Sequence, residues 1–236
     1  MASSKNCRWE SLGKEGKGMP LYICSPVDEQ PHGAVILLQE IFGVNRHMMD
    51  VAERVMSEGY AAVVPDLFWR HGPRITNRYD EVQKGLERVS SLTEETFLAD
   101  MDDVLGKLKS EFGVSGQAVG VLGFCMGGRL AYLTAATKPL GAAVSFYGGG
   151  IVQGPLKRTE GIQCPVLLLF GGKDKHISKS DVEAIRSRLA AADKHAEVVV
   201  YPEAEHGFFC DERASYNEAA SNDAWERVLN FFSKNL

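Results

Sequence analysis

The stretch VGVLGFCMGG at residues 119–128 decides the fold that this sequence predicts. Apolar residues lead into a turn that holds Cys125 between glycines, and the helix-like run RLAYLTAAT at 129–137 follows. A strand, a Gly-x-nucleophile-x-Gly turn and a helix together form a nucleophile elbow, which exposes a reactive side chain at the end of the strand. The pattern makes Cys125 a candidate nucleophile. A small buried cysteine in a glycine-rich turn is the alternative that the motif alone leaves open.

The helix expected after this turn gives the cysteine a chemical reason to react. The first N–H groups of a helix have no partner within it, and they favour a nearby thiolate or oxyanion. We therefore expect Cys125 to ionise more easily than a free thiol, whose pKa is about 8.5.

Apolar runs alternate with amphipathic runs on both sides of the elbow. Strands are expected at 20–26 (an edge strand), 33–40, 61–66, 118–124, 142–150, 165–174 and 197–203. Helices are expected at 46–60, 94–113, 127–137, 179–192 and 223–235, and the segment 67–80 reads as irregular. This alternation predicts an α/β fold over residues 1–236 as a single domain, with a mainly parallel central sheet flanked by helices on both faces.

Composition excludes several function classes. The formal net charge of the 236 residues is −5 and no basic run occurs, so no nucleic-acid partner is expected. The apolar runs are too short to cross a membrane, and the N-terminus is polar, so neither a membrane partner nor a secretory leader is expected. The five cysteines are scattered without a C-x-x-C pair, which predicts free thiols in a cytoplasmic protein with no metal site.

Two later strand ends carry further polar residues. Asp174 follows the strand PVLLLF just past a Gly-Gly turn, and His206 follows the strand VVVYPE. Nucleophile, acid and histidine then occur in the chain order of a hydrolase triad, each after the carboxyl end of a different strand. Separately, Asp174 reads as a helix cap and His206 as a surface residue. Together, their order and positions favour a Cys125–His206–Asp174 triad.

The sequence resembles the dienelactone hydrolase family of the α/β hydrolases. The resemblance covers nearly the whole chain in order, and QEIFG at 39–43 together with GFCMGG at 123–128 makes it specific. The other matching stretches are GYAAVVPDLF, AAVSFYGGG, CPVLLLFGGKDKHI and EHGFF.

The resemblance implies a role for each residue of the candidate site. Cys125 would attack a carbonyl carbon, His206 would move the proton, and Asp174 would orient the imidazolium. The backbone N–H groups of Ile41 and Met126 would bind the oxyanion. No cofactor is implied.

The resemblance also implies a role for Glu40 and for Tyr147, and each residue has a simpler alternative explanation. Glu40 would hold the resting thiol and accept its proton when an anionic substrate arrives; otherwise it is a strand-end carboxylate paired with an arginine such as Arg46. Tyr147 would line the substrate site; otherwise it is a half-buried ring at the rim.

The sequence departs from the family pattern at the substrate clamp. Founding members hold a substrate carboxylate with two arginines, one of them four residues after the triad histidine, where this chain has Cys210. A missing arginine should weaken the preference for dienelactones, because an arginine fork matches a carboxylate. Arg213, or an arginine of the irregular segment, is a candidate substitute. These candidates in the irregular segment are Arg70, Arg74 and Arg78.

The function predicted is that of a cofactor-free hydrolase that cleaves a small ester or lactone of dienelactone type through an acyl-cysteine intermediate. A general carboxylesterase or thioesterase acting on neutral esters is the enzyme alternative. A hydrolase fold that binds a ligand without turnover is the alternative from a different class, and Cys125, Asp174 and His206 argue against it. The oligomeric state is not predicted.

Overall fold

The computed structural model describes residues 6–13, 18–27 and 29–236, and it divides into two compact units, 1–119 and 120–236. Over the described residues, each unit is an α/β structure with four strands. Among the described residues, no helix is long and apolar enough to cross a membrane.

The strands of the first unit lie in the order β1-β2-β4-β3. They are β1 (Cys7–Ser11), β2 (Pro20–Cys24), β3 (Ala34–Leu38) and β4 (Ala61–Pro65). Strand β2 pairs antiparallel with both β1 and β4, and β3 pairs parallel with β4. The expectation of an edge strand at β2 is therefore wrong: β1 covers it, and all five β2 residues are buried.

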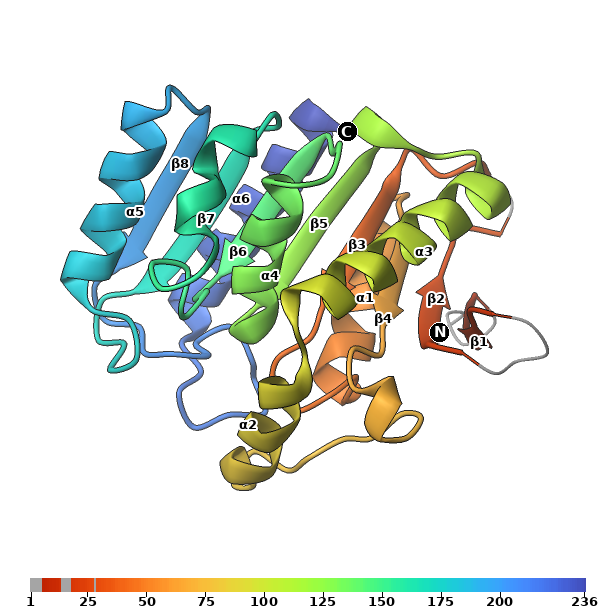
Figure 1. Ribbon diagram of the computed structural model, residues 1–236, viewed down its shortest axis with the longest axis horizontal. Helices are drawn as coiled ribbons and strands as arrows, with labels where there is room; N and C mark the ends of the chain where they lie inside the picture. Colours follow the sequence, from red (N-terminus) through yellow and green to blue (C-terminus); the bar gives the residue numbers. More distant parts are fainter. Residues whose placement is uncertain (1–5, 14–17, 28) are drawn as a thin grey trace. The chain divides into compact units, whose positions relative to one another are not determined.

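The helices of the first unit are α1 (Arg46–Ser57), α2 (Val82–Ser91) and α3 (Glu94–Phe112). Asn45 caps α1 by accepting the backbone N–H of Met48, and Thr93 caps α3 in the same way. Within this unit α3 lies in front of the strands and α1 behind them in Figure 1. The helix expected at 46–60 is α1, and its buried stripe includes Met48, Ala52, Val55 and Met56.

The segment 67–80, expected to be irregular, contains neither strand nor α-helix. A turn of 3-10 helix, η2 (Trp69–His71), lies within it, and α2 begins just after it. The helix α2 was not predicted, although Val82, Leu86 and Val89 stand at the spacing of one helical face. Within α2 only Gly85 is buried, and Val82 and Leu86 are exposed.

Cys7 and Cys24 form a disulfide between β1 and β2. They are directly opposed in the antiparallel register, with Cα atoms 4.1 Å apart. The expectation that all five cysteines are free is wrong for these two. Spacing along the chain could not reveal the pair, because it arises from the strand register.

The strands of the second unit lie in the order β5-β6-β7-β8, and all are parallel. They are β5 (Val119–Phe124), β6 (Ala142–Phe146), β7 (Val166–Gly171) and β8 (Ala196–Tyr201). Figure 1 shows α4 (Met126–Ala135) and α5 (Lys179–Ala191) in front of these strands and α6 (Glu218–Asn235) behind them. The strands β5, β6 and β7 are buried along their whole length, as their continuous apolar runs predicted.

Candidate active site

Cys125 lies in the sharp turn between β5 and α4, with φ 55° and ψ −114°. A positive φ is uncommon for a residue with a side chain, and such strain is concentrated at functional sites. The backbone N–H of Cys125 donates to the carbonyl of Phe146 on β6, at 3.0 Å, and this bond fixes the turn against the neighbouring strand. The Cys125 thiol is partly exposed, whereas Cys164 and Cys210 are buried.

Gly123 explains why the turn needs glycine on its strand side. A Cβ atom built there would lie 2.0 Å from the carbonyl oxygen of Gly127. The chain therefore folds back so tightly that the first turn of α4 occupies the place of a side chain. The elbow expected from the sequence is present, and this close approach is what its glycine makes possible.

His206 and Asp174 meet beside each other although 32 residues separate them. Nδ1 of His206 lies 2.8 Å from Oδ2 of Asp174, so a protonated Nδ1 donates to the carboxylate. The other oxygen of Asp174 accepts the backbone N–H groups of His176 and Ile177, at 2.7 and 3.1 Å. These bonds hold the carboxylate in one orientation. The side chain of Asp174 is fully buried, and that of His206 is 12% exposed.

The charges of the three predicted triad residues reinforce one another. Burial alone would lower the pKa of His206, but hydrogen bonds to Asp174 and Cys125 and their negative charges raise it to about 10. Burial alone would raise the pKa of Asp174, but the bond and charge of His206 and the two backbone donors bring it below its usual value. The structure thus brings Cys125, His206 and Asp174 together in a chain of hydrogen bonds that favours an imidazolium.

Met126 is the first residue of α4, directly after Cys125. The N–H groups at the start of a helix have no partner within the helix. That the backbone N–H of Met126 binds an oxyanion formed at Cys125 stays a prediction. The side chain of Met126 is buried and only has to fit.

Tyr147 is fully buried, which differs from the half-buried rim position considered from the sequence. Its φ is 37°, and its backbone N–H donates to the carbonyl of Leu169 at 2.7 Å. Its ring centroid lies 5.1 Å from that of His206. Tyr147 therefore supports the histidine from the core side of the site; its expected contact with substrate stays a prediction.

The four arginines considered for a substrate clamp have different surroundings. Within the first unit, Arg70 forms a two-pronged ion pair with Asp100, Arg74 lies over the ring of Trp9, and Arg78 pairs with Asp80. Arg213 instead lies against Gly207, the residue after His206.

Cys210, at the family position of a clamp arginine, is fully buried. Its backbone N–H donates to the carbonyl of Gly207 at 3.2 Å, so this position belongs to the turn that carries His206. A side chain here points into packed protein.

Glu40 and Ile41 lie in the first unit, just after β3, and both are buried. Arg46, the surface partner considered for Glu40, is largely exposed and pairs with Asp50. The burial of Glu40 does not fit a surface ion pair. Ile41 is held from its own unit, because the side-chain amide of Asn77 donates to its carbonyl at 3.5 Å.

A cavity of about 160 Å³ reaches the triad histidine. Its lining residues are Lys173, Lys175, His176, Glu205, His206, Arg213 and Ser215. Basic groups outnumber acidic ones around it. His176 was not predicted as a site residue, although its place two residues after Asp174 is visible in the stretch KDKHI.

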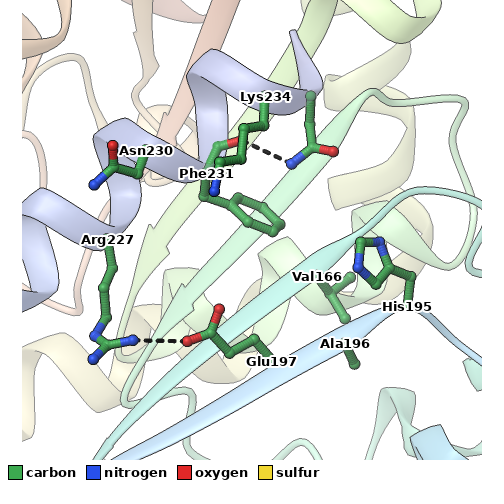
Figure 2. A pocket seen from close by; sticks show the side chains of 9 residues that line it. Val166, His195, Ala196, Glu197, Arg227, Asn230, Phe231 and Lys234 are labelled. Carbon is green, nitrogen blue, oxygen red and sulfur yellow. Dashed lines mark hydrogen bonds and ion pairs between the residues drawn. The ribbon is translucent and has the colours of Figure 1, made fainter.

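A larger hollow of about 630 Å³ lies elsewhere in the second unit, between the start of β7, the start of β8 and the end of α6 (Figure 2). Arg227 is held there by Glu197 and Asp223, at 2.8 and 2.6 Å. No triad residue lines it, and parallel sheets build their active sites at the opposite, carboxyl ends of the strands. Size alone therefore does not make this hollow the active site.

Comparisons with known proteins give the family and the fold of this chain. The model of the "Dienelactone hydrolase family" matches residues 19–236. A Synechocystis protein named "Putative carboxymethylenebutenolidase" is 37% identical over 226 residues, covering 91% of each chain. The crystal structure of a "Putative Dienelactone Hydrolase" from Klebsiella pneumoniae has a TM-score of 0.88 at 36% identity, covering 97% of this chain and 98% of that one.

A more distant solved structure, an alpha/beta hydrolase enzyme from a deep-sea metagenome library, gives a TM-score of 0.72 at 15% identity. It covers 97% of this chain and 98% of that one. At that identity the likeness concerns the fold alone.

Proposed function

This chain belongs to the dienelactone hydrolase family and is a carboxylic ester hydrolase with an α/β-hydrolase fold, and from that premise we propose that it cleaves a small ester or lactone through an acyl-cysteine intermediate. The observation that carries the proposal is the hydrogen-bonded chain Cys125–His206–Asp174, with the 2.8 Å bond between its last two members. A residue that only filled space between glycines would have no need of the other two.

In the first half of the reaction the Cys125 thiolate attacks the carbonyl carbon of the ester. The carbonyl π electrons move to oxygen, which becomes a tetrahedral oxyanion. As the oxyanion collapses, the C–O bond to the leaving group breaks, and the imidazolium of His206 gives its proton to the departing alkoxide. An alcohol and an acyl-cysteine result; for a lactone, the alcohol stays attached to the acyl group.

In the second half, His206 is neutral and takes a proton from water as that water attacks the thioester carbonyl. Collapse of the second oxyanion breaks the C–S bond and releases the acid. The thiolate and imidazolium are restored, so no net charge or proton is left on the enzyme. Asp174 stabilises the imidazolium in both halves through its fixed carboxylate.

The remaining site residues are assigned by the family resemblance. The backbone N–H groups of Met126 and Ile41 would stabilise the oxyanion; loss of one such donor typically lowers kcat about 100-fold to 1000-fold. Glu40 would hold the resting thiol and take its proton when an anionic substrate arrives, which leaves the thiolate beside an already protonated His206; it would return that proton to Cys125 after the product leaves. Tyr147 would line the substrate site.

The substrate class is a small lactone or ester that carries a carboxylate. The basic lining of the cavity beside His206 supports this, and Arg213 is the residue we propose for the carboxylate. Replacing it by Arg213→Gln should lower kcat/KM for a dienelactone about tenfold or more, because a charge-assisted hydrogen bond contributes about 1.5–3 kcal/mol. The rate with p-nitrophenyl acetate should change little.

Cys210, which replaces the family clamp arginine, favours the second candidate, an esterase or thioesterase acting on neutral esters. Equal losses on both substrates in Arg213→Gln would support that candidate over the dienelactone type.

The experiment that tests the acyl-cysteine is intact-mass analysis during turnover of p-nitrophenyl acetate. Wild type should gain one acetyl group, located on Cys125, and Cys125→Ala should gain none and lose activity. Cys164→Ala, which removes a buried thiol, is the matched control and should behave as wild type. Equal rates in wild type and Cys125→Ala would instead favour a ligand-binding role without cysteine chemistry.

The cytoplasm is the location we propose, and small molecules are the only partners proposed. The Cys7–Cys24 disulfide counts against a cytoplasmic location, because disulfides persist in oxidising compartments and are rare in the cytosol. The state of that pair in cells lysed with a thiol-blocking reagent therefore tests the location.

A further inference from the structure

The second histidine of the site, His176, contacts the ring of His206. The two ring centroids lie 5.1 Å apart with an angle of 78° between the planes, an edge-to-face arrangement that rings prefer. His176 is exposed, and it comes from the loop that follows β7. His206 thus has a buried ring, Tyr147, and an exposed ring, His176, at the same distance.

The backbone of His176 acts on the other partner of His206. Its N–H donates to Oδ1 of Asp174 at 2.7 Å, while Oδ2 of Asp174 bonds to His206. One residue therefore restrains the acid through its main chain and contacts the base through its side chain. The first interaction survives any substitution except proline, whereas the second depends on the ring. This separation makes the side-chain contribution measurable by itself.

We propose that His176 is a positioning residue whose ring holds the imidazole of His206 in the orientation that bonds to both Asp174 and Cys125. The inference rests on the proposed function, since it takes His206 to be the base. Without the ring, His206 gains room to turn toward the cavity that both histidines line. The hydrogen bond to Cys125 then forms less often, and the thiolate–imidazolium pair is less populated.

Several charged groups line the cavity beside this contact: Lys173, Lys175, Glu205 and Arg213. Lys173 forms an ion pair with Glu203. Asp174 and Cys125 are the hydrogen-bond partners of His206, and both carry negative charge toward it. A test must therefore separate the ring of His176 from the general charge of the cavity.

Alkylation of Cys125 by iodoacetamide is the readout, because it needs the thiolate but no ester turnover. The rate is measured from pH 5 to pH 9 in wild type, His176→Ala, His176→Phe and Lys175→Ala. We expect alkylation of His176→Ala to be about twofold to tenfold slower at pH 7, because the loss of one contact between rings changes an equilibrium by about that factor. Its curve of alkylation rate against pH should move to higher pH. His176→Phe keeps a ring and should return to within twofold of wild type.

Lys175→Ala is the matched control: an exposed residue of the same loop that lines the same cavity, and its profile should follow wild type. The proposal is overturned if His176→Ala keeps the wild-type profile, if His176→Phe behaves like His176→Ala, or if Lys175→Ala shows the same shift. Thermal melting checks that the variants are folded, and His176→Gln replaces His176→Ala if that variant is not. Wild type that fails to turn over esters while this pattern holds would overturn the proposed hydrolysis and leave the positioning role standing.

Discussion

The guanidinium group of Arg213 lies directly over the Cα atom of Gly207, so that a Cβ atom at Gly207 would be 2.1 Å from Nη1 of the arginine. Gly207 has φ +77° and follows His206 directly. The turn that presents the histidine therefore favours glycine for its backbone conformation, and a side chain there would displace the guanidinium group of Arg213.

Gly207→Ala is expected to destabilise the protein by about the backbone effect alone. A left-handed conformation costs a residue with a side chain about 1–2 kcal/mol. Gly113→Ala is the matched control, because Gly113 has φ +68° but nothing within 4 Å of a built Cβ. Because the guanidinium end of Arg213 can turn aside, the two variants should melt at similar temperatures, and Gly207→Ala alone should lose turnover of a dienelactone as Arg213→Gln does. A much larger loss of stability in Gly207→Ala would show that Arg213 is held in place.

Cys210→Arg should lower stability rather than create a carboxylate clamp. Cys210 is fully buried, and an unpaired charge placed there costs about 3–5 kcal/mol. For a chain of this size the melting temperature should fall by roughly 6–20 °C, measured by calorimetry. Cys210→Ser, which keeps the size of the side chain, should lose much less. A melting temperature near that of wild type, with better turnover of a dienelactone, would show that the arginine reaches the substrate after all.

The raised pKa of His206 predicts how its contribution to stability depends on pH. The folded-state value of about 10 lies above the reference value of about 6.5. Protonated His206 therefore stabilises the fold fully below about pH 6.5, and this contribution is lost as pH rises through about 10. Urea unfolding of wild type and His206→Gln at pH 6, 8 and 10 measures it. The difference in unfolding free energy between them should shrink as pH rises, and a constant difference would count against the ion pair.

Thiol titration tests the Cys7–Cys24 disulfide. Unfolded protein without reductant should show the three free cysteines, Cys125, Cys164 and Cys210, and reduced protein should show all five. Because the pair closes a separation of 17 residues, its reduction should lower the free energy of unfolding by about 3 kcal/mol. Five thiols without any reductant would mean that the pair is open in the purified protein, as a cytoplasmic location predicts.

The elements that position the triad were predictable, because a local sequence pattern indicates each of them. The buried strands β5 and β7 are continuous apolar runs, and Cys125 and Asp174 stand at their carboxyl ends in glycine-marked turns. The disulfide was not predictable, because it depends on which residues of β1 and β2 are opposed.

The surroundings of the site were also beyond the sequence. The burial of Cys210 and the contact of His176 with His206 depend on how loops fold back on the strand ends, and no periodic pattern describes such loops. The family model spans residues of both compact units, and the single domain expected from composition stays a prediction.

The backbone conformation of Cys125 lowers the stability of the fold, whereas its thiol is needed for the proposed activity. Its φ of 55° is a conformation that glycine adopts freely and cysteine does not. Cys125→Gly should therefore melt at a higher temperature than Cys125→Ala, and it has removed the nucleophile as well. A laboratory selection of this protein for thermal tolerance alone would tend to discard the cysteine, so any such selection has to demand turnover at the same time.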